Sequence, residues 1–197
     1  MKKSTVRVTV VFVVMILIVI GFYAYLSGKS RAAADDVKMT QIQLVLSRDM
    51  QNDYPPTVKE VIKYYMDIQK CLYNEECTDE DVEQLGLRAR ELYDTELLEN
   101  NEEEMNLQQL RAEVASFRSD EKKITSISVA SSVNVDTFME DGYDFARIQC
   151  SYTVLEKGQS NPTSTIYLLR RDENRRWKIY GWDLAQKVDA REVLDRM

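Results

Sequence analysis

The pattern of apolar and polar residues divides the chain into three parts. Residues 8–26 are 19 consecutive residues without a charged side chain, and at about 1.5 Å per residue they nearly span the hydrocarbon layer of a bilayer. From residue 38 to 118, apolar positions recur at steps of three and four, which indicates helices. From residue 124 to 183 they alternate with polar positions, which indicates strands. The pattern therefore predicts a membrane helix followed by an α+β domain.

Four helices are expected in the first half of the domain. They cover about residues 38–50, 57–73, 79–98 and 102–118. The second helix has the plainest signals, because Thr57 and Glu60 form a capping box that satisfies free amides at a helix start. One apolar stripe follows it, which predicts a helix that packs against a core; the stripe is Val58, Val61, Ile62, Tyr65, Ile68 and Leu72.

The second half of the domain predicts an antiparallel meander of about four strands. The expected strands are at about residues 124–136, 143–155, 164–171 and 176–183. Asp141-Gly142 is typical of a tight hairpin, and residues 158–162 are expected to form a longer loop. One face of this sheet is apolar, so the helical stripes are expected to cover it. Residues 184–197 predict a weak terminal helix.

The N-terminal pattern also predicts where the domain lies. A short cytoplasmic tail at residues 1–7, an anchor at 8–26 and a linker at 27–36 would place a domain at 37–183 outside the cytoplasm. Membrane lipid would then contact the anchor. The alternative is a secreted protein, because Ala32-Ala33-Ala34 fits the pattern that signal peptidase cleaves. Both interpretations put the domain outside the cytoplasm.

Composition narrows the function classes. The chain carries 33 acidic and 26 basic residues, and the part from residue 27 onward has a net charge of −10 because three of the basic residues precede the anchor. Such a charge disfavours binding to nucleic acid. There is no histidine, so Ser–His and Cys–His nucleophiles are excluded. Asp144 and Asp183 remain the best candidates for a general base, and neither has a visible partner. No metal site or cofactor is expected, because the acidic clusters lack the spacing of a calcium loop.

The three cysteines have different expected roles. Cys71 and Cys77 are separated by five residues, near a helix end. Outside the cytoplasm they could form a disulfide, or they could be one buried and one exposed thiol. Cys150 lies on the apolar side of its strand, where a buried thiol is expected.

Residues 170–183, RRDENRRWKIYGWD, combine arginines with aromatic residues. Strand alternation places Trp177 and Ile179 on the buried side. The same alternation places Lys178, Tyr180 and Trp182 together on the outer side. These three residues are the predicted surface for a partner.

Three segments carry a resemblance to known families. Residues 54–76, 91–101 and 177–183 resemble an uncharacterised membrane-anchored family of Gram-positive bacteria, over roughly residues 38–183. The charged turn followed by Trp-Lys-Ile, at residues 170–179, resembles the nuclear transport factor 2-like cone fold. The layout is also distantly similar to extracytoplasmic assembly proteins of type IV secretion and conjugation systems. The cone fold hosts both enzymes and binding modules, so it does not fix the function.

The sequence therefore predicts a non-catalytic envelope protein that binds a protein partner or an envelope component. Two alternatives stay open. The domain could be a small-ligand binding module, or an isomerase-like enzyme, that uses the mouth of the cone. It could also be a structural subunit of a secretion or conjugation assembly, as a homo- or hetero-oligomer.

Overall fold

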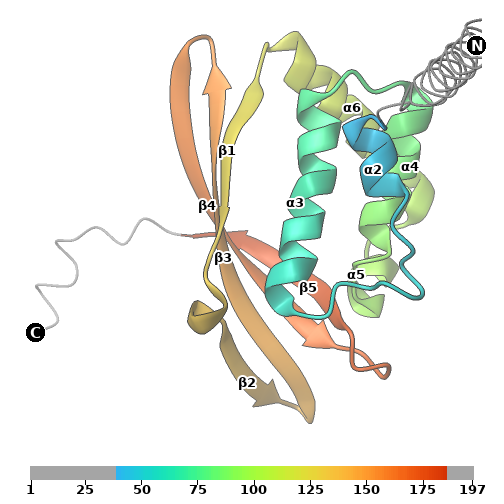
Figure 1. Ribbon diagram of the computed structural model, residues 1–197, viewed down its shortest axis with the longest axis vertical. Helices are drawn as coiled ribbons and strands as arrows, with labels where there is room; N and C mark the ends of the chain where they lie inside the picture. The colour runs from blue at the N-terminus through green and yellow to red at the C-terminus, as the bar shows by residue number, and fades with distance from the viewer. Residues whose placement is uncertain (1–38, 186–197) are drawn as a thin grey trace, which may run out of the picture. The chain divides into compact units, whose positions relative to one another are not determined.

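A computed structural model describes residues 39–185 of the chain (Figure 1). Contacts divide the chain into two units, Met1–Met39 and Thr40–Met197. The fold below is that of the second unit. The expected anchor, tail and linker, and most of the expected terminal helix, lie outside the described residues. Within residues 39–185, no helix is long and apolar enough to cross a membrane.

The described part is an α+β domain in which helices lie on one side of a curved antiparallel sheet (Figure 1). This confirms the predicted class and the predicted order of helices before strands. The helices are α2 (Gln41–Leu46), α3 (Val58–Asn74), α4 (Asp79–Arg90), α5 (Thr95–Glu99) and α6 (Glu103–Ser119). Three of them begin at a threonine whose side chain accepts a backbone N–H of the first turn, namely Thr40, Thr57 and Thr78.

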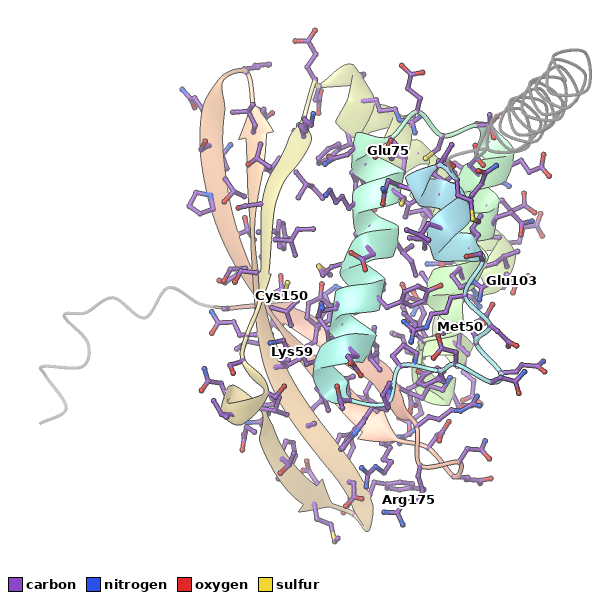
Figure 2. The ribbon with its side chains drawn as sticks, viewed as in Figure 1. Met50, Lys59, Glu75, Glu103, Cys150 and Arg175 are labelled. Carbon is purple, nitrogen blue, oxygen red and sulfur yellow. The ribbon has the colours of Figure 1, made fainter. Side chains whose placement is uncertain are left out.

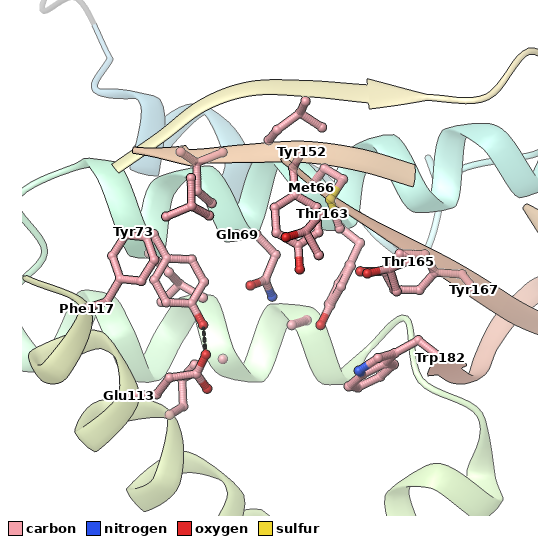
Figure 3. A pocket seen from close by; sticks show the side chains of 18 of the residues that line it. Met66, Gln69, Tyr73, Glu113, Phe117, Tyr152, Thr163, Thr165, Tyr167 and Trp182 are labelled. Carbon is pink, nitrogen blue, oxygen red and sulfur yellow. Dashed lines mark hydrogen bonds between the residues drawn. The ribbon is translucent and has the colours of Figure 1, made fainter. Parts of the chain in front are cut away.

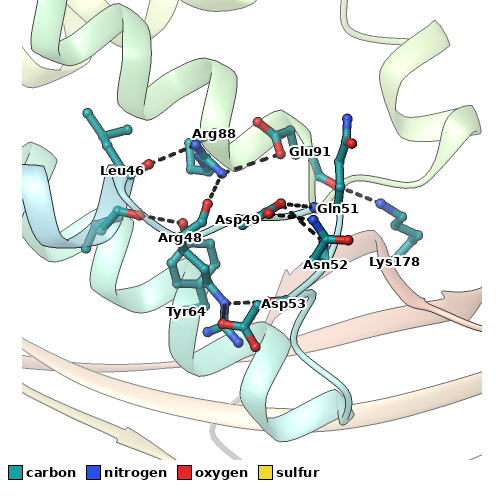
Figure 4. A network of polar contacts seen from close by, with 11 residues as sticks. Leu46, Arg48, Asp49, Gln51, Asn52, Asp53, Tyr64, Arg88, Glu91 and Lys178 are labelled. Atoms are coloured by element: carbon teal, nitrogen blue, oxygen red, sulfur yellow. Dashed lines mark hydrogen bonds and ion pairs between the residues drawn. The ribbon is translucent and has the colours of Figure 1, made fainter.

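Helix α2 is shorter than the predicted helix at 38–50. The backbone carbonyls of Leu46 and Arg48 accept hydrogen bonds from the Arg88 guanidinium, at 3.0 and 2.8 Å (Figure 4). These carbonyls therefore find a partner on α4, and the helix does not continue past Leu46. A sequence pattern cannot show such a contact, because the two partners are about forty positions apart.

The prediction of a single helix at 79–98 is wrong. Helix α4 ends at Arg90, and residues 92–94 instead pair with the edge of strand β5. The N–H of Ile179 donates to the Leu92 carbonyl, and the N–H of Asp94 donates to the Ile179 carbonyl, each at 2.8 Å. Asp94 then caps α5 by accepting the N–H of Glu96 at 3.0 Å. Pairing with the sheet thus replaces helical hydrogen bonds at this point.

The sheet has five strands rather than about four. They are β1 (Lys123–Val129), β2 (Asp136–Glu140), β3 (Tyr143–Glu156), β4 (Gln159–Arg171) and β5 (Trp177–Leu184), and their order is β1-β3-β4-β5, with β2 also paired to β3. The strand expected at 124–136 is interrupted by a 3-10 turn at Ser132–Asn134, so that β1 and β2 each pair with a different stretch of β3.

The hairpins β2–β3 and β3–β4 have tight turns. Asp141 and Gly142 both have positive φ, as the Asp-Gly signal predicted. The prediction of a longer loop at 158–162 is wrong. Lys157 and Gly158 also form a two-residue turn, and β4 begins at Gln159. Pro162 is tolerated inside β4 because pairing with β5 starts only at Thr165, so the missing N–H lies on a free edge.

The core lies between the sheet and helix α3. Most of its fully buried residues come from α3, α4 and the inner face of β3, β4 and β5; they include Ile62, Ile68, Leu72, Leu85, Ile148, Leu169 and Ile179. Each such side chain stabilises the fold by roughly 1.5–3 kcal/mol relative to exposure. Side chains from both layers meet there, with Cys150 among them (Figure 2). Cys150 is buried, as predicted.

Candidate pocket between the helices and the sheet

A pocket of about 840 Å³ opens between the sheet and helices α3, α4 and α6 (Figure 3). Helix α3 contributes Tyr65, Met66 and Gln69 to it. Helix α6 contributes Glu113 and Phe117, and the sheet contributes Thr163, Thr165 and Tyr167 among others. The helices and the inner face of the sheet thus enclose a space that their side chains do not fill.

Aromatic rings form one end of this pocket. Tyr65, Tyr93, Tyr167 and Trp182 pack together with ring centroids 5.8 to 6.3 Å apart in five pairs. Tilted and edge-on arrangements at such distances stabilise aromatic clusters. Tyr65 and Tyr167 are buried, whereas Trp182 is 48% exposed. Trp182 therefore lies where the aromatic end of the pocket meets solvent.

A bulge in β5 places Trp182 in this cluster. Ile179 pairs with Leu169 and Gly181 pairs with Leu168, so that Tyr180 is an extra residue without a partner on β4. Beyond the bulge the alternation is reversed, and Trp182 pairs with Tyr167 on the helix-facing side. The prediction that Trp182 shares the outer side with Lys178 and Tyr180 is therefore wrong. Simple alternation fails because it assumes an unbroken ladder.

The other two residues of the predicted partner surface are engaged within the domain. The Lys178 ammonium donates to the Glu91 carbonyl at 2.6 Å and lies over the Tyr54 ring. Burial lowers the pKa of Lys178. The Tyr180 hydroxyl donates to the Glu96 carboxylate at 2.7 Å. Both side chains tie β5 to the segment after α4.

Hydroxyl groups supply much of the polarity inside the pocket. The Tyr73 hydroxyl donates to the Glu113 carboxylate at 2.6 Å, and the Tyr65 and Tyr93 hydroxyls lie 3.3 Å apart. Burial raises the pKa of Tyr65, Tyr93 and Tyr167 above the ordinary tyrosine value. These hydroxyls are therefore neutral at physiological pH and can donate or accept hydrogen bonds.

The candidate catalytic carboxylates do not come together. Asp144 faces Arg171, with Oδ2 3.4 Å from its guanidinium, while Asp183 lines the pocket near its exposed end. Within residues 39–185, no group of three or more acidic or cysteine side chains is arranged to hold a metal ion.

All three cysteines are free thiols in this structure. The Cys77 thiol donates to the Cys71 backbone carbonyl at 3.3 Å, and Cys71 itself is buried. The Cys71–Cys77 disulfide stays a prediction. Non-reducing peptide mapping of the native protein would test it.

The fold and the pocket define an α+β domain with a partly aromatic pocket between its helices and its sheet. A family model, described as a domain of unknown function (DUF6715), matches residues 1–182. The chain belongs to this family. No curated protein matches the chain.

Proposed function

We propose that the domain is a non-catalytic binding module that takes a small, largely apolar ligand into the pocket. The observation that carries this proposal is the cavity of about 840 Å³. Ligand sites commonly have volumes of roughly 300–1,000 Å³ and combine apolar walls with a few polar groups. The Tyr65, Tyr167 and Trp182 rings supply such a wall.

The chemistry of the walls favours an uncharged ligand with a flat or aliphatic body. The body would pack on Trp182 and Tyr167, and a polar group would reach Gln69, whose side chain points into the space near Glu113 (Figure 3). Gln69 makes no side-chain hydrogen bond within the described part of the chain. A ligand group that both donates and accepts would satisfy its carboxamide.

Binding is preferred over catalysis because of the residues available. The chain has no histidine, and the Glu113 carboxylate in the pocket already accepts the Tyr73 hydroxyl. Burial and this hydrogen bond raise the pKa of Tyr73, so a reaction would rest on one carboxylate beside a hydroxyl that keeps its proton. Turnover of any compound by the purified chain that disappears in Glu113→Gln would overturn the non-catalytic assignment.

The proposed setting is the outer face of a cell membrane. The uncharged run at 8–26 supports a single anchor with the N-terminus in the cytoplasm, and cleavage near Ala34 is the alternative. Helices packed over a curved sheet with a cavity between them support the nuclear transport factor 2-like cone. An apolar component of the envelope is then the natural source of a ligand. A role in a secretion or conjugation assembly stays a prediction.

A neutral fluorophore tests the pocket directly. The domain from residue 35 onward would be titrated with N-phenyl-1-naphthylamine, whose fluorescence rises in apolar surroundings. Thr163→Trp fills the pocket, whereas Ile166→Trp adds the same side chain to the same strand outside it. We expect a saturable signal that Thr163→Trp abolishes and Ile166→Trp retains. Equal signals from the two variants would refute the proposal.

A further inference from the structure

A second concavity, of about 500 Å³, lies between α3 and the edge of β1 and shares three lining residues with the first pocket, whose aromatic end was described above. Its helical wall carries Lys59, Lys63, Met66, Asp67 and Lys70, and its other wall is β1 from Ile124 to Val129. Figure 1 shows α3 running beside β1. We call this concavity the β1 groove.

The β1 groove contains a strand edge whose outward backbone groups are only partly hydrogen-bonded. The Asn74 carboxamide accepts the N–H of Ile124 at 2.9 Å and donates to the Ile124 carbonyl at 2.8 Å. One side chain thus makes the pair of hydrogen bonds that a further strand would make. It does so at one end of the groove.

Farther along β1, the backbone groups that face the groove make no hydrogen bond within the described residues. Ala130 donates its N–H to Gln149 on β3 at 2.9 Å, and hydrogen-bonded pairs recur at every second residue of an antiparallel ladder. Ser126 and Ser128 therefore direct their backbone groups toward β3, whereas Ile127 and Val129 direct theirs to the groove. Within residues 39–185, no side chain or other strand bonds to these outer groups.

The helical wall adds positive charge beside this edge. Lys59, Lys63 and Lys70 make no ion pair within the described part of the chain. Asp67 is the carboxylate in the same row, so the wall keeps a net positive charge. This contrasts with the domain as a whole, which is acidic.

We propose that the β1 groove binds an extended acidic segment of a protein partner, which adds to the sheet as a strand beside β1. Backbone bonds to Ile127 and Val129 would give affinity, and the lysines would select for acidic side chains. Lys59 and Lys63 are one helical turn apart, about 6 Å along the axis. Alternate strand residues are about 6.6 Å apart, so acidic residues at alternate positions fit the row.

The aromatic pocket is not involved in this proposal. Met66, Ile124 and Ile127 line both concavities, whereas the three lysines and Val129 line only the β1 groove. The proposed peptide site and the proposed small-ligand site can therefore be tested separately.

The test uses the full chain in a non-ionic detergent and a fluorescein-labelled peptide that alternates glutamate with threonine. We expect saturable binding by anisotropy, which weakens as salt rises. The same peptide with lysine in place of glutamate should not bind. Lys63→Glu with Lys70→Glu should lower the affinity about tenfold or more, whereas Lys157→Glu, in the exposed turn between β3 and β4, should leave it unchanged.

Two further measurements test the strand-like geometry. Hydrogen exchange of residues 123–130, followed by mass spectrometry, should slow when the peptide is saturating. Of two peptides that are N-methylated on alternate amides, one should bind and the other should not. Undetectable binding, equal binding of acidic and basic peptides, equal effects of the groove and turn variants, unchanged exchange, or equal binding of both methylated peptides would each overturn the proposal.

Discussion

The Arg170 guanidinium on β4 donates two hydrogen bonds to the carboxylate of Asp94, which lies in the segment between α4 and α5. Its Nε lies 3.0 Å from Asp94 Oδ2, and its Nη2 lies 2.5 Å from Asp94 Oδ1. Both side chains are largely buried, at 13% and 5% exposure. Asp94 also caps α5 and donates its own N–H to Ile179. This one pair therefore joins the helical layer to the last hairpin.

Asp94→Ala should destabilise the fold strongly, because it leaves the buried Arg170 guanidinium without its principal partner. Loss of one member of a buried pair costs about 3–5 kcal/mol. The control is Asp144→Ala, which breaks the more exposed contact with Arg171 and should cost below about 1 kcal/mol. Urea denaturation measures both. Equal midpoints for the two variants would contradict the role of the buried pair.

Elements that depend on local signals were predicted correctly. Helix α3 was predicted within a residue or two at each end because Thr57 caps it and an apolar stripe follows. The turn at Asp141-Gly142 was predicted because both positions require positive φ. Such features depend on neighbours in the sequence, so the pattern contains them.

The predictions were wrong where contacts between residues far apart in the sequence determine the structure. The helix after Thr78 ends early because residues 92–94 pair with β5, about 87 positions away. Trp182 was placed on the wrong face because the Tyr180 bulge cannot be read from alternation. A ligand pocket was predicted only within one of the open alternatives, and none of its aromatic residues was assigned to it. Tyr65 was placed in the core-facing stripe of its helix and Trp182 on the outer side of its strand, so the pattern indicated no pocket at either position.

The two tryptophans should respond differently to truncation. Trp177 is buried under the Arg171 guanidinium, which lies 4.6 Å from its ring, whereas Trp182 is half exposed at the pocket. Trp177→Ala should cost about 3–5 kcal/mol, as removal of a large core side chain does. Trp182→Ala should cost much less.

The same variants distinguish stability from binding. Trp182→Ala should reduce the affinity for N-phenyl-1-naphthylamine severalfold while the urea midpoint shifts only slightly, because the ring forms a wall of the pocket. An unchanged affinity would remove Trp182 from the proposed site. A loss of stability equal to that of Trp177→Ala would show that Trp182 belongs to the core instead.

Stability should fall in alkaline solution, partly through Cys150. Burial raises the pKa of this thiol to about 11, from an ordinary value of 9.0. The folded state therefore holds the proton more tightly than the unfolded chain does. The contribution is complete below about pH 9 and is lost as the pH rises toward 11. A shift of this size corresponds to about 1–3 kcal/mol.

Cys150→Ala isolates this effect. The cavity that it creates lowers the free energy of unfolding by an amount independent of pH. The pH-dependent loss of the thiol is then present in the natural chain and absent from the variant. Urea midpoints at pH 7, 9 and 10.5 should therefore converge as the pH rises. A constant difference between the two proteins would contradict the raised pKa.

The proposed anchor gives a prediction about the ends of the chain. If residues 8–26 span the membrane once with the N-terminus inside, alkaline phosphatase fused after residue 185 should be active, because that enzyme matures only outside the cytoplasm. Replacing Val14 and Ile18 by arginine should abolish membrane retention, since each charge costs about 2.5–3.5 kcal/mol in the middle of an apolar helix. Intact mass of the natural protein decides between anchor and cleavage, because a chain that starts at Asp35 would show that the apolar run is removed as a signal.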